Sequence, residues 1–317
     1  MEEPLLPEEE DAPSRLRLVA KLAVGLVFLV PVYYLAGMLY LHKIDDDPTL
    51  ALNVEVPVGG SRAVAVAAAL IDREVNHNRW VANDPWFMPG SMLDNMPQFQ
   101  EGVIASIARF GIELTDHIAR VRGSSQIDAD ADDAAGRLKY PGNVWIFEWS
   151  ATPVQQSSES SYRKALESLT RYNRRLAENE ATFERRSDNL LDTLDRIASD
   201  LGSSSAALYD KIDRTEGAWF DFDADNLFYA NKGRLYGYYM LLLGLGDDFR
   251  SVIEGRDLQT AWDQLIFSFE RAAGLQPWVV INGDLDSQIK PNHLAAQGFL
   301  LLRARTQLRE VTNILLK

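Results

Sequence analysis

The sequence contains no cysteine, only 4 histidines and too few basic residues to balance its acidic ones. Without thiols the chain cannot use a Cys nucleophile, a CxxC redox pair, a thiolate zinc site, a disulfide or a lipoprotein cysteine. Its 317 residues include 32 Lys and Arg against 46 Asp and Glu, a formal net charge of −14. Since nucleic-acid recognition begins with a basic face, this balance argues against a nucleic-acid partner.

Long hydrophobic runs are also scarce, and one stands out. Residues 22–41, LAVGLVFLVPVYYLAGMLYL, carry no charge, and at ~1.5 Å per helical residue they match a hydrocarbon core of ~30 Å. A cleaved signal peptide fits less well, because its apolar region runs ~7 to 15 residues and ends at a small-residue cleavage site. The run therefore predicts a retained transmembrane helix that contacts the lipid bilayer.

The charges around this run predict its orientation. Arg15, Arg17 and Lys21 precede it, whereas Lys43 follows it and is succeeded at once by acidic residues. The positive-inside rule then places the N-terminus in the cytoplasm. We expect three parts: a short acidic cytoplasmic tail (1–17), a single-pass transmembrane anchor (18–43) and a periplasmic domain (44–317).

The predicted periplasmic domain is acidic, with 28 basic and 40 acidic side chains and a formal net charge of −12. An acidic domain is repelled by anionic lipid, so we expect it to stand away from the bilayer. The absence of cysteine and of Asn-x-Ser/Thr sequons agrees with a bacterial periplasm.

Hydrophobic periodicity predicts a mainly α fold, in which the anchor is followed by a bundle-like helical domain. Helices are indicated after Ser61, over 97–122 and after Pro291, and 236–245 is apolar but too short for a second span. Two interruptions are expected: an ordered loop over 78–99 and a polar, Asp-rich loop over 124–142. The apolar runs 144–149 and 278–281 are predicted to pair as a small β ribbon.

Residues 162–201 carry the most regular pattern in the chain. Every seventh residue from Tyr162 to Ile197 is apolar, while the companion series from Leu166 turns polar in its middle. A single helix of this length would extend roughly 60 Å. The polar middle favours a helical hairpin packed within the domain, and the alternative is a coiled coil with an envelope protein partner or a second copy.

Four side chains form a candidate metal site. Glu74 and His77 are three residues apart and Glu113 and His117 four apart, so each pair shares one face of a helix. If the two helices met, this two-His, two-Glu cluster could bind zinc or iron. Capping or ion-paired histidines are the favoured interpretation, and the sequence identifies no cofactor.

An aromatic loop forms a second candidate site. Trp80, Trp86 and Phe87 lie in the proline-containing stretch 78–99, which we expect to be ordered. Aromatic side chains gathered in such a loop could line a ligand pocket.

Three stretches resemble one bacterial family: NRWVANDPWFMPGSMLDNMPQFQ, DADNLFYANKGRLYGYY and NHLAAQGFLLLRARTQLRE. They are similar to a family of bacterial single-pass inner-membrane proteins catalogued as a domain of unknown function. The resemblance extends over nearly the whole chain, including the anchor. It implies a Gram-negative inner-membrane setting and brings no catalytic residues.

These observations favour a membrane-anchored periplasmic interaction or scaffold protein of the cell envelope, without evident catalytic activity. One alternative is a metal-dependent envelope hydrolase or oxidase built on the Glu and His pairs. Another is a periplasmic sensor or ligand-binding module built on the aromatic loop.

Overall fold

The computed structural model describes residues 14–120, 127–147, 154–214, 222–285 and 287–317. Within these ranges every regular element is a helix, so the prediction of a mainly α fold is confirmed. The elements are α1 (Ser14–Leu41), α2 (Leu50–Asn53), α3 (Arg62–Asp72), η1 (Arg73–His77), η2 (Pro89–Met92), α4 (Asn95–Glu113), η3 (Leu114–Ile118), α5 (Ala129–Leu138), α6 (Ser158–Ala177), α7 (Ser187–Arg214), α8 (Phe222–Asp248), α9 (Arg250–Gly255), α10 (Gln259–Ala273) and α11 (His293–Leu315).

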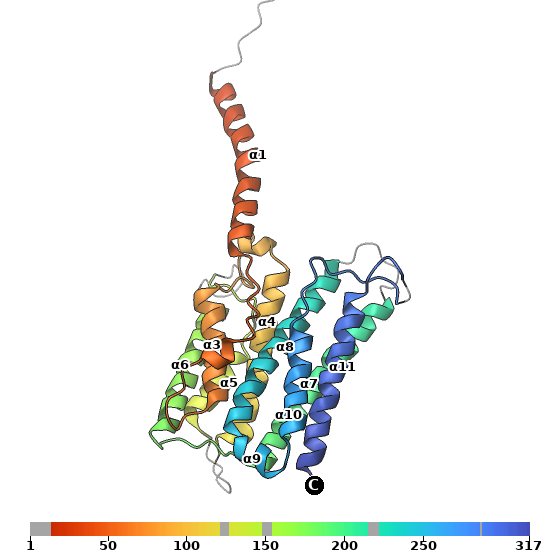
Figure 1. The fold of residues 1–317 in the computed structure, drawn as a ribbon. Coiled ribbons are helices and arrows are strands. Elements are labelled where there is room, and N and C mark those ends of the chain that lie inside the picture. Colours follow the sequence, from red (N-terminus) through yellow and green to blue (C-terminus); the bar gives the residue numbers. More distant parts are fainter. Residues whose placement is uncertain (1–13, 121–126, 148–153, 215–221, 286) are drawn as a thin grey trace, which may run out of the picture.

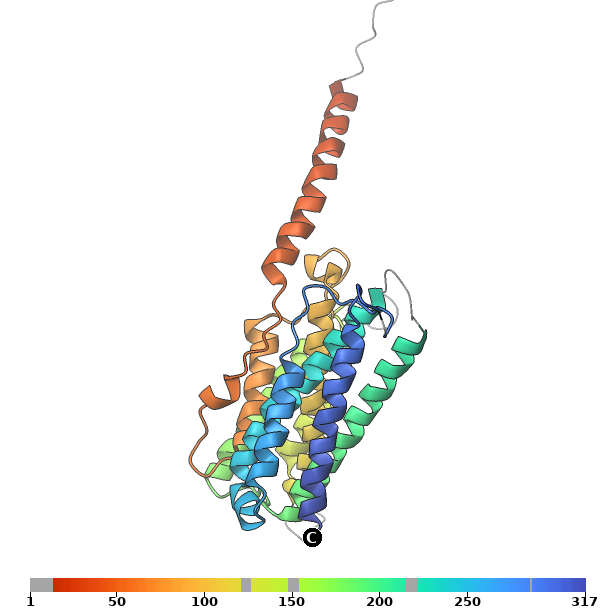
Figure 2. The same cartoon turned by 45° about the vertical axis from the view of Figure 1, so that its right-hand side comes forward.

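Helix α1 projects from one end of a bundle formed by the other long helices (Figure 1), and the view turned by 45° shows the same arrangement (Figure 2). Its residues 18–41 have a mean hydropathy of 2.2, and apart from Leu41, which is buried against the bundle, their side chains are exposed or half-buried. The helix is therefore long and apolar enough to cross a membrane. We call the end of the bundle next to α1 the α1 end and the opposite end, which includes α9, the far end.

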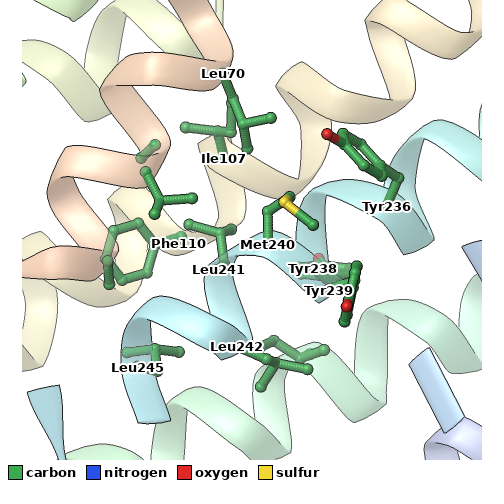
Figure 3. Packing of buried hydrophobic residues seen from close by; sticks show 14 of the residues in the cluster. Leu70, Ile107, Phe110, Tyr236, Tyr238, Tyr239, Met240, Leu241, Leu242 and Leu245 are labelled. Carbon is green, nitrogen blue, oxygen red and sulfur yellow. The ribbon is translucent and has the colours of Figure 1, made fainter. Parts of the chain in front are cut away.

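Helix α8 forms the centre of the bundle and packs along α4, α10 and α3. Figure 3 shows buried side chains of α8 beside Leu70 of α3 and Ile107 and Phe110 of α4. At Gly233 a Cβ atom would collide with the carbonyl of Phe99, so this glycine permits the close approach of α4. The apolar run 236–245 is thus a core helix, as its length predicted.

The heptad segment is divided into two helices, so the long heptad helix is not continuous, and its two halves pack mainly on other helices and not on each other as a hairpin. Helix α6 packs on α5 and α3, whereas α7 packs mainly on α11. Between them Asn179 adopts a positive φ of 60°, a conformation that Asn tolerates better than most residues. The apolar heptad positions from Tyr162 to Ile197 are buried within the chain, as are Leu194 and Leu201 of the companion series, whereas Leu166 is half-buried, and this agrees with packing inside the domain.

The expected Asp-rich loop over 124–142 is wrong for its described part, because α5 forms there. Asp128 caps this helix by accepting hydrogen bonds from the backbone N–H groups of Asp130 and Ala131. Arg175 of α6 neutralises the carboxylates, with its guanidinium 2.9 Å from Asp128 and 2.8 Å from Asp130. Three of its alanines, Ala131, Ala134 and Ala135, are buried. Residues 124–126 lie outside the described ranges.

The predicted β ribbon is also absent from the described residues. Segment 144–147 bonds instead to the chain just before α6, where Gln155 donates its backbone N–H to Ile146. Ile281 bonds to His293, and an isolated antiparallel bridge joins Asn282 to Asn292. Each apolar run therefore pairs with a stretch that is near it in the sequence. Such pairing closes a shorter loop, and so costs less chain entropy, than pairing of the two runs across the bundle would. Residues 148 and 149 lie outside the described part of the chain.

Candidate functional site at the α1 end

Three aspartates connect α1 to the bundle. Asp45, Asp46 and Asp47 lie shortly after α1, which ends at Leu41, and the Asp46 carboxylate accepts a hydrogen bond from the Nζ of Lys232 at 2.6 Å. The Lys232 side chain on α8 is only 2% exposed. Its Nζ also donates to the carbonyls of Ala273 at 3.2 Å and Leu275 at 2.6 Å. All three donor positions of this ammonium group are therefore occupied.

A second buried cation holds the same connection. Arg73 donates to the Tyr236 hydroxyl at 2.7 Å and lies 3.4 Å from the Asp45 carboxylate. The Tyr236 hydroxyl in turn donates to the Asp47 carbonyl at 2.8 Å. We call these six residues the polar clamp: Asp45, Asp46, Asp47, Arg73, Lys232 and Tyr236.

Burial and hydrogen bonding set the pKa values in the clamp. Burial lowers the pKa of Lys232 below its ordinary value, and the nearby Asp46 offsets only part of this effect. For Asp46, burial disfavours ionisation, but hydrogen bonds from Lys232 and Gln276 outweigh it and the pKa is lowered. The Asp46 carboxylate is thus held in its ionised form by its partners.

A groove opens beside the clamp, with a volume of about 580 Å³. Asp46 and Tyr236 of the clamp form part of its wall. Tyr239, Phe267 and Leu300 supply apolar surface from α8, α10 and α11, and Glu270 and Arg271 add charge. This volume is within the range of about 300–1,000 Å³ found for ligand pockets, and the mixed lining suits an apolar group that carries polar neighbours.

The structure does not bring the four predicted metal ligands together. Glu74 is buried beside the clamp, where its carboxylate accepts hydrogen bonds from Arg73 and from Gln100 of α4. Burial raises the Glu74 pKa, and both hydrogen-bonding partners oppose this shift. His77 is exposed, and its ring lies 3.0 Å from Asp72.

The other pair lies at the far end. Glu113 is 13 residues beyond Gln100 along α4, which corresponds to ~20 Å of helix. His117 lies 3.8 Å from both Glu113 and Asp192. Among the residues with described positions, no group of three or more His, Asp or Glu side chains could hold a metal ion. The predicted two-His, two-Glu site is therefore not formed among the residues with described positions.

The three aromatic residues proposed for a ligand pocket have different environments. Trp80 is buried, packs edge-on against Tyr162 at 5.0 Å and donates its indole N–H to the Gly142 carbonyl. Trp86 and Phe87 lie outside the bundle, where they are 79% and 42% exposed. They contact each other edge-on at 5.7 Å, so the three side chains do not line one shared pocket.

The backbone beside Trp86 and Phe87 contacts α1. The Tyr34 hydroxyl donates to the Trp86 carbonyl at 2.5 Å, and the Tyr33 hydroxyl donates to the Phe87 carbonyl at 3.2 Å. Gly37 of α1 lies against the Pro89 ring so closely that a Cβ atom there would collide with it. The aromatic loop therefore packs alongside the last two turns of α1.

Sequence reasoning missed Arg73, Lys232 and Tyr236 as functional candidates. Lys232 lies between the apolar residues 227–230 and the apolar run 236–245, and its position in a predicted core helix is a weak signal of a buried, paired cation. Its partner Asp46 is 186 positions away, and only the fold brings the two together.

Comparison with protein families gives one result. The family described as "Uncharacterized protein conserved in bacteria (DUF2333)" matches residues 53–218, a little over half of the chain. The chain belongs to this bacterial family. The DUF2333 match includes the NRWVANDPWFMPGSMLDNMPQFQ motif and ends before the other two motifs of the resemblance. Comparisons with curated proteins and with solved structures find no match.

Proposed function

We propose that this protein is a single-pass inner-membrane protein whose periplasmic domain binds protein partners at a fixed position beside the bilayer. Helix α1 is the membrane span, with the N-terminus in the cytoplasm and residues 44–317 in the periplasm. The apolar length of α1, its exposed surface and the basic residues before it support this topology. The bacterial distribution of the DUF2333 family agrees with it.

The polar clamp is the observation that carries the proposal. A domain that needs only to be tethered can be joined to its anchor by a flexible linker. Here two buried cations, Lys232 and Arg73, hold the residues that follow α1. Fixing the anchor to the domain serves a protein that presents a surface at a set height and direction, as an interaction or scaffold component does.

The groove beside the clamp is the partner surface that we propose. It lies at the α1 end, within reach of segments of other membrane proteins, and its apolar lining includes the exposed Phe267. Because the domain carries a net charge of −12, a partner segment with an apolar side chain and basic neighbours is complementary to it. A small apolar ligand is the alternative occupant of the groove. In that case the protein would be a sensor or ligand-binding module.

The heptad segment 162–201 remains an alternative surface for a partner or a second copy. Its apolar positions are buried within the chain, so a partner would have to bind the outward, polar faces of α6 and α7. Glu167 is an exposed residue on such a face.

Site-specific photo-crosslinking in intact cells tests these surfaces. A photoreactive residue replaces Phe267 in the groove, Glu167 on α6 or Glu254 at the far end, in the full chain. We expect a discrete protein adduct from position 267 and none from 254. Adducts from 167 alone would move the partner surface to α6, and the absence of adducts at all three positions would contradict the scaffold proposal.

A separate experiment tests the topology. Alkaline extraction should leave the full chain in the membrane fraction, and a protease added to the periplasmic side should cleave residues 44–317. Extraction at high pH, or protection of the domain from the protease, would overturn the proposed topology.

A further inference from the structure

The exposed aromatic side chains of the bundle are distributed unevenly. Among the residues whose side chains are described, exposed large hydrophobic groups at the far end are aliphatic, as at Val58, Ile127 and Leu316. Exposed tryptophans occur at Trp86 and Trp278, and both belong to loops at the α1 end. The loop that contains Trp278 connects α10 to α11 and lies at the same end as the base of α1 (Figure 1).

We propose that the α1 end of the domain rests on the outer surface of the bilayer, with two loops inserted into the lipid interface. The first is the part of the aromatic loop that lies against α1, residues 85–93, and the name aromatic loop refers to these residues from here on. The second is the Trp278 loop (residues 276–285 and 287–292). The proposal rests on the membrane span proposed for α1 and adds a second mode of lipid contact.

The position of the aromatic loop against α1 supports insertion. Tyr33 lies eight residues before the end of α1, which is ~12 Å along the helix axis. Since the carbonyls of Trp86 and Phe87 accept hydrogen bonds from Tyr34 and Tyr33, the loop lies beside the last turns of the helix. If residues 22–41 span the bilayer, these turns lie in the outer part of it, and so does the loop.

The Trp278 loop is held in place with its apolar side chains outward. His293 donates its backbone N–H to the Ile281 carbonyl and accepts the Ile281 N–H at Nδ1, both at 2.9 Å. Asn292 donates its side-chain amide to the Gly283 carbonyl. Trp278 and Ile289 are nevertheless almost fully exposed. Removing such apolar side chains from water is favourable, and the interface between lipid and water is where tryptophan is enriched.

The charge pattern allows contact with a lipid surface despite the acidic total. The aromatic loop, PWFMPGSML, contains no charged residue, and the sequence of the Trp278 loop carries Lys290 against Asp284 and Asp286. Net charge describes the whole domain, whereas repulsion from anionic lipid acts on the charges nearest the surface, within a Debye length of about 8 Å. The expectation that the whole domain stands away from the bilayer is thereby revised for its α1 end.

The absence of cysteine allows a direct test in the full chain. Single cysteines replace Trp278, Ile289, Trp86 or, at the far end, Val58, and each is spin-labelled in vesicles of phosphatidylethanolamine and phosphatidylglycerol. Collision of the label with lipid-soluble oxygen is compared with collision with a water-soluble nickel chelate. We expect the oxygen-to-nickel ratio to be several-fold higher for Trp278→Cys, Ile289→Cys and Trp86→Cys than for Val58→Cys.

A label at Leu29→Cys in α1 separates this proposal from the membrane span on which it rests. A high oxygen-to-nickel ratio at position 29 together with low ratios at 278 and 289 overturns the docking of the loops and leaves the membrane span intact. A protein would then be the better candidate to cover these loops. A water-exposed label at position 29 overturns the span itself. Far-UV circular dichroism of each variant shows whether it is folded.

Discussion

The two ends of the bundle use charged residues differently. At the α1 end, Lys232 and Arg73 are buried and hold the aspartates that follow α1, and the adjoining aromatic loop is uncharged. At the far end, the buried Asp248 caps α3 by accepting hydrogen bonds from Ser61 and from the N–H groups of Arg62 and Ala63.

The difference indicates two roles for buried charged groups: one stabilises a helix, and the other fixes the position of the domain relative to α1. The far-end carboxylate satisfies backbone donors at the start of a helix, which is a general requirement of helical folds. The cations at the α1 end instead fix the route of the chain between α1 and the domain. If our proposal is correct, disruption of the far end should affect stability alone, whereas disruption of the α1 end should also affect how the domain is held at the membrane.

The largest effect is expected from Lys232→Ala, which leaves two carbonyls without this donor and leaves the Asp46 carboxylate with Gln276 but without its cation. Breaking a buried ion pair costs about 3–5 kcal/mol, which should lower the unfolding midpoint by on the order of 10 °C. Circular dichroism of the solubilised full chain measures this. The double variant Asp46→Asn, Lys232→Met should recover most of the loss, and an unchanged midpoint for the single variant would show that the clamp does not hold the connection.

The next largest effect concerns the packing of α8 at each end of the bundle. A Cβ atom at Gly233 would meet the carbonyl of Phe99, and one at Gly244 would lie 2.6 Å from the Ala63 Cα. Gly233→Ala and Gly244→Ala should each cost about 1–3 kcal/mol through overpacking. The control Gly136→Ala in α5 meets no atom within 4 Å and should be neutral or slightly stabilising. A cost at only one end would show that α8 is tightly packed there alone.

Asp248→Asn tests the far end by itself. The amide retains one acceptor oxygen where the carboxylate serves three donors, so we expect a loss of roughly 1–2 kcal/mol in the free energy of unfolding. The spin-label accessibilities of the Trp278 loop should stay unchanged. A change in those accessibilities would mean that the two ends are coupled.

The smallest effect is the pH dependence of the Trp278 loop. Burial lowers the pKa of His293 below its ordinary value of 6.5, and the neutral ring accepts the Ile281 N–H at Nδ1. The stabilisation is therefore complete above pH 6.5 and is lost as the pH falls through the lowered pKa, because the protonated ring cannot accept. The protection factor of the Ile281 amide, which is the exchange rate of an unstructured peptide divided by the observed rate at the same pH, should fall on acidification by an amount equivalent to about 1 kcal/mol. His293→Gln should remove this pH dependence.

Local pattern predicted the helices well where one face of each is buried. The leucines at 294, 301, 308 and 315 are buried along α11, and Ser61 caps α3 as expected. The pattern failed where a cap or a turn decided the outcome. Asp128 begins a helix inside an acidic stretch, and Asn179 lies in the turn that interrupts the heptad series. Short polar signals of this kind are ambiguous, because they occur in loops as well as at helix ends.

By itself, the sequence determined that the protein is mainly helical, that it has one long apolar helix near its N-terminus and that cysteine chemistry is excluded. Only the tertiary structure decided that Lys232 meets Asp46, that Arg73 meets Tyr236, and that Glu74 and Glu113 lie at different ends of the bundle. Periodicity reports which face of a helix is buried, because burial follows the helical repeat. It carries no information on which distant residue covers that face, since this choice depends on how all the helices pack together.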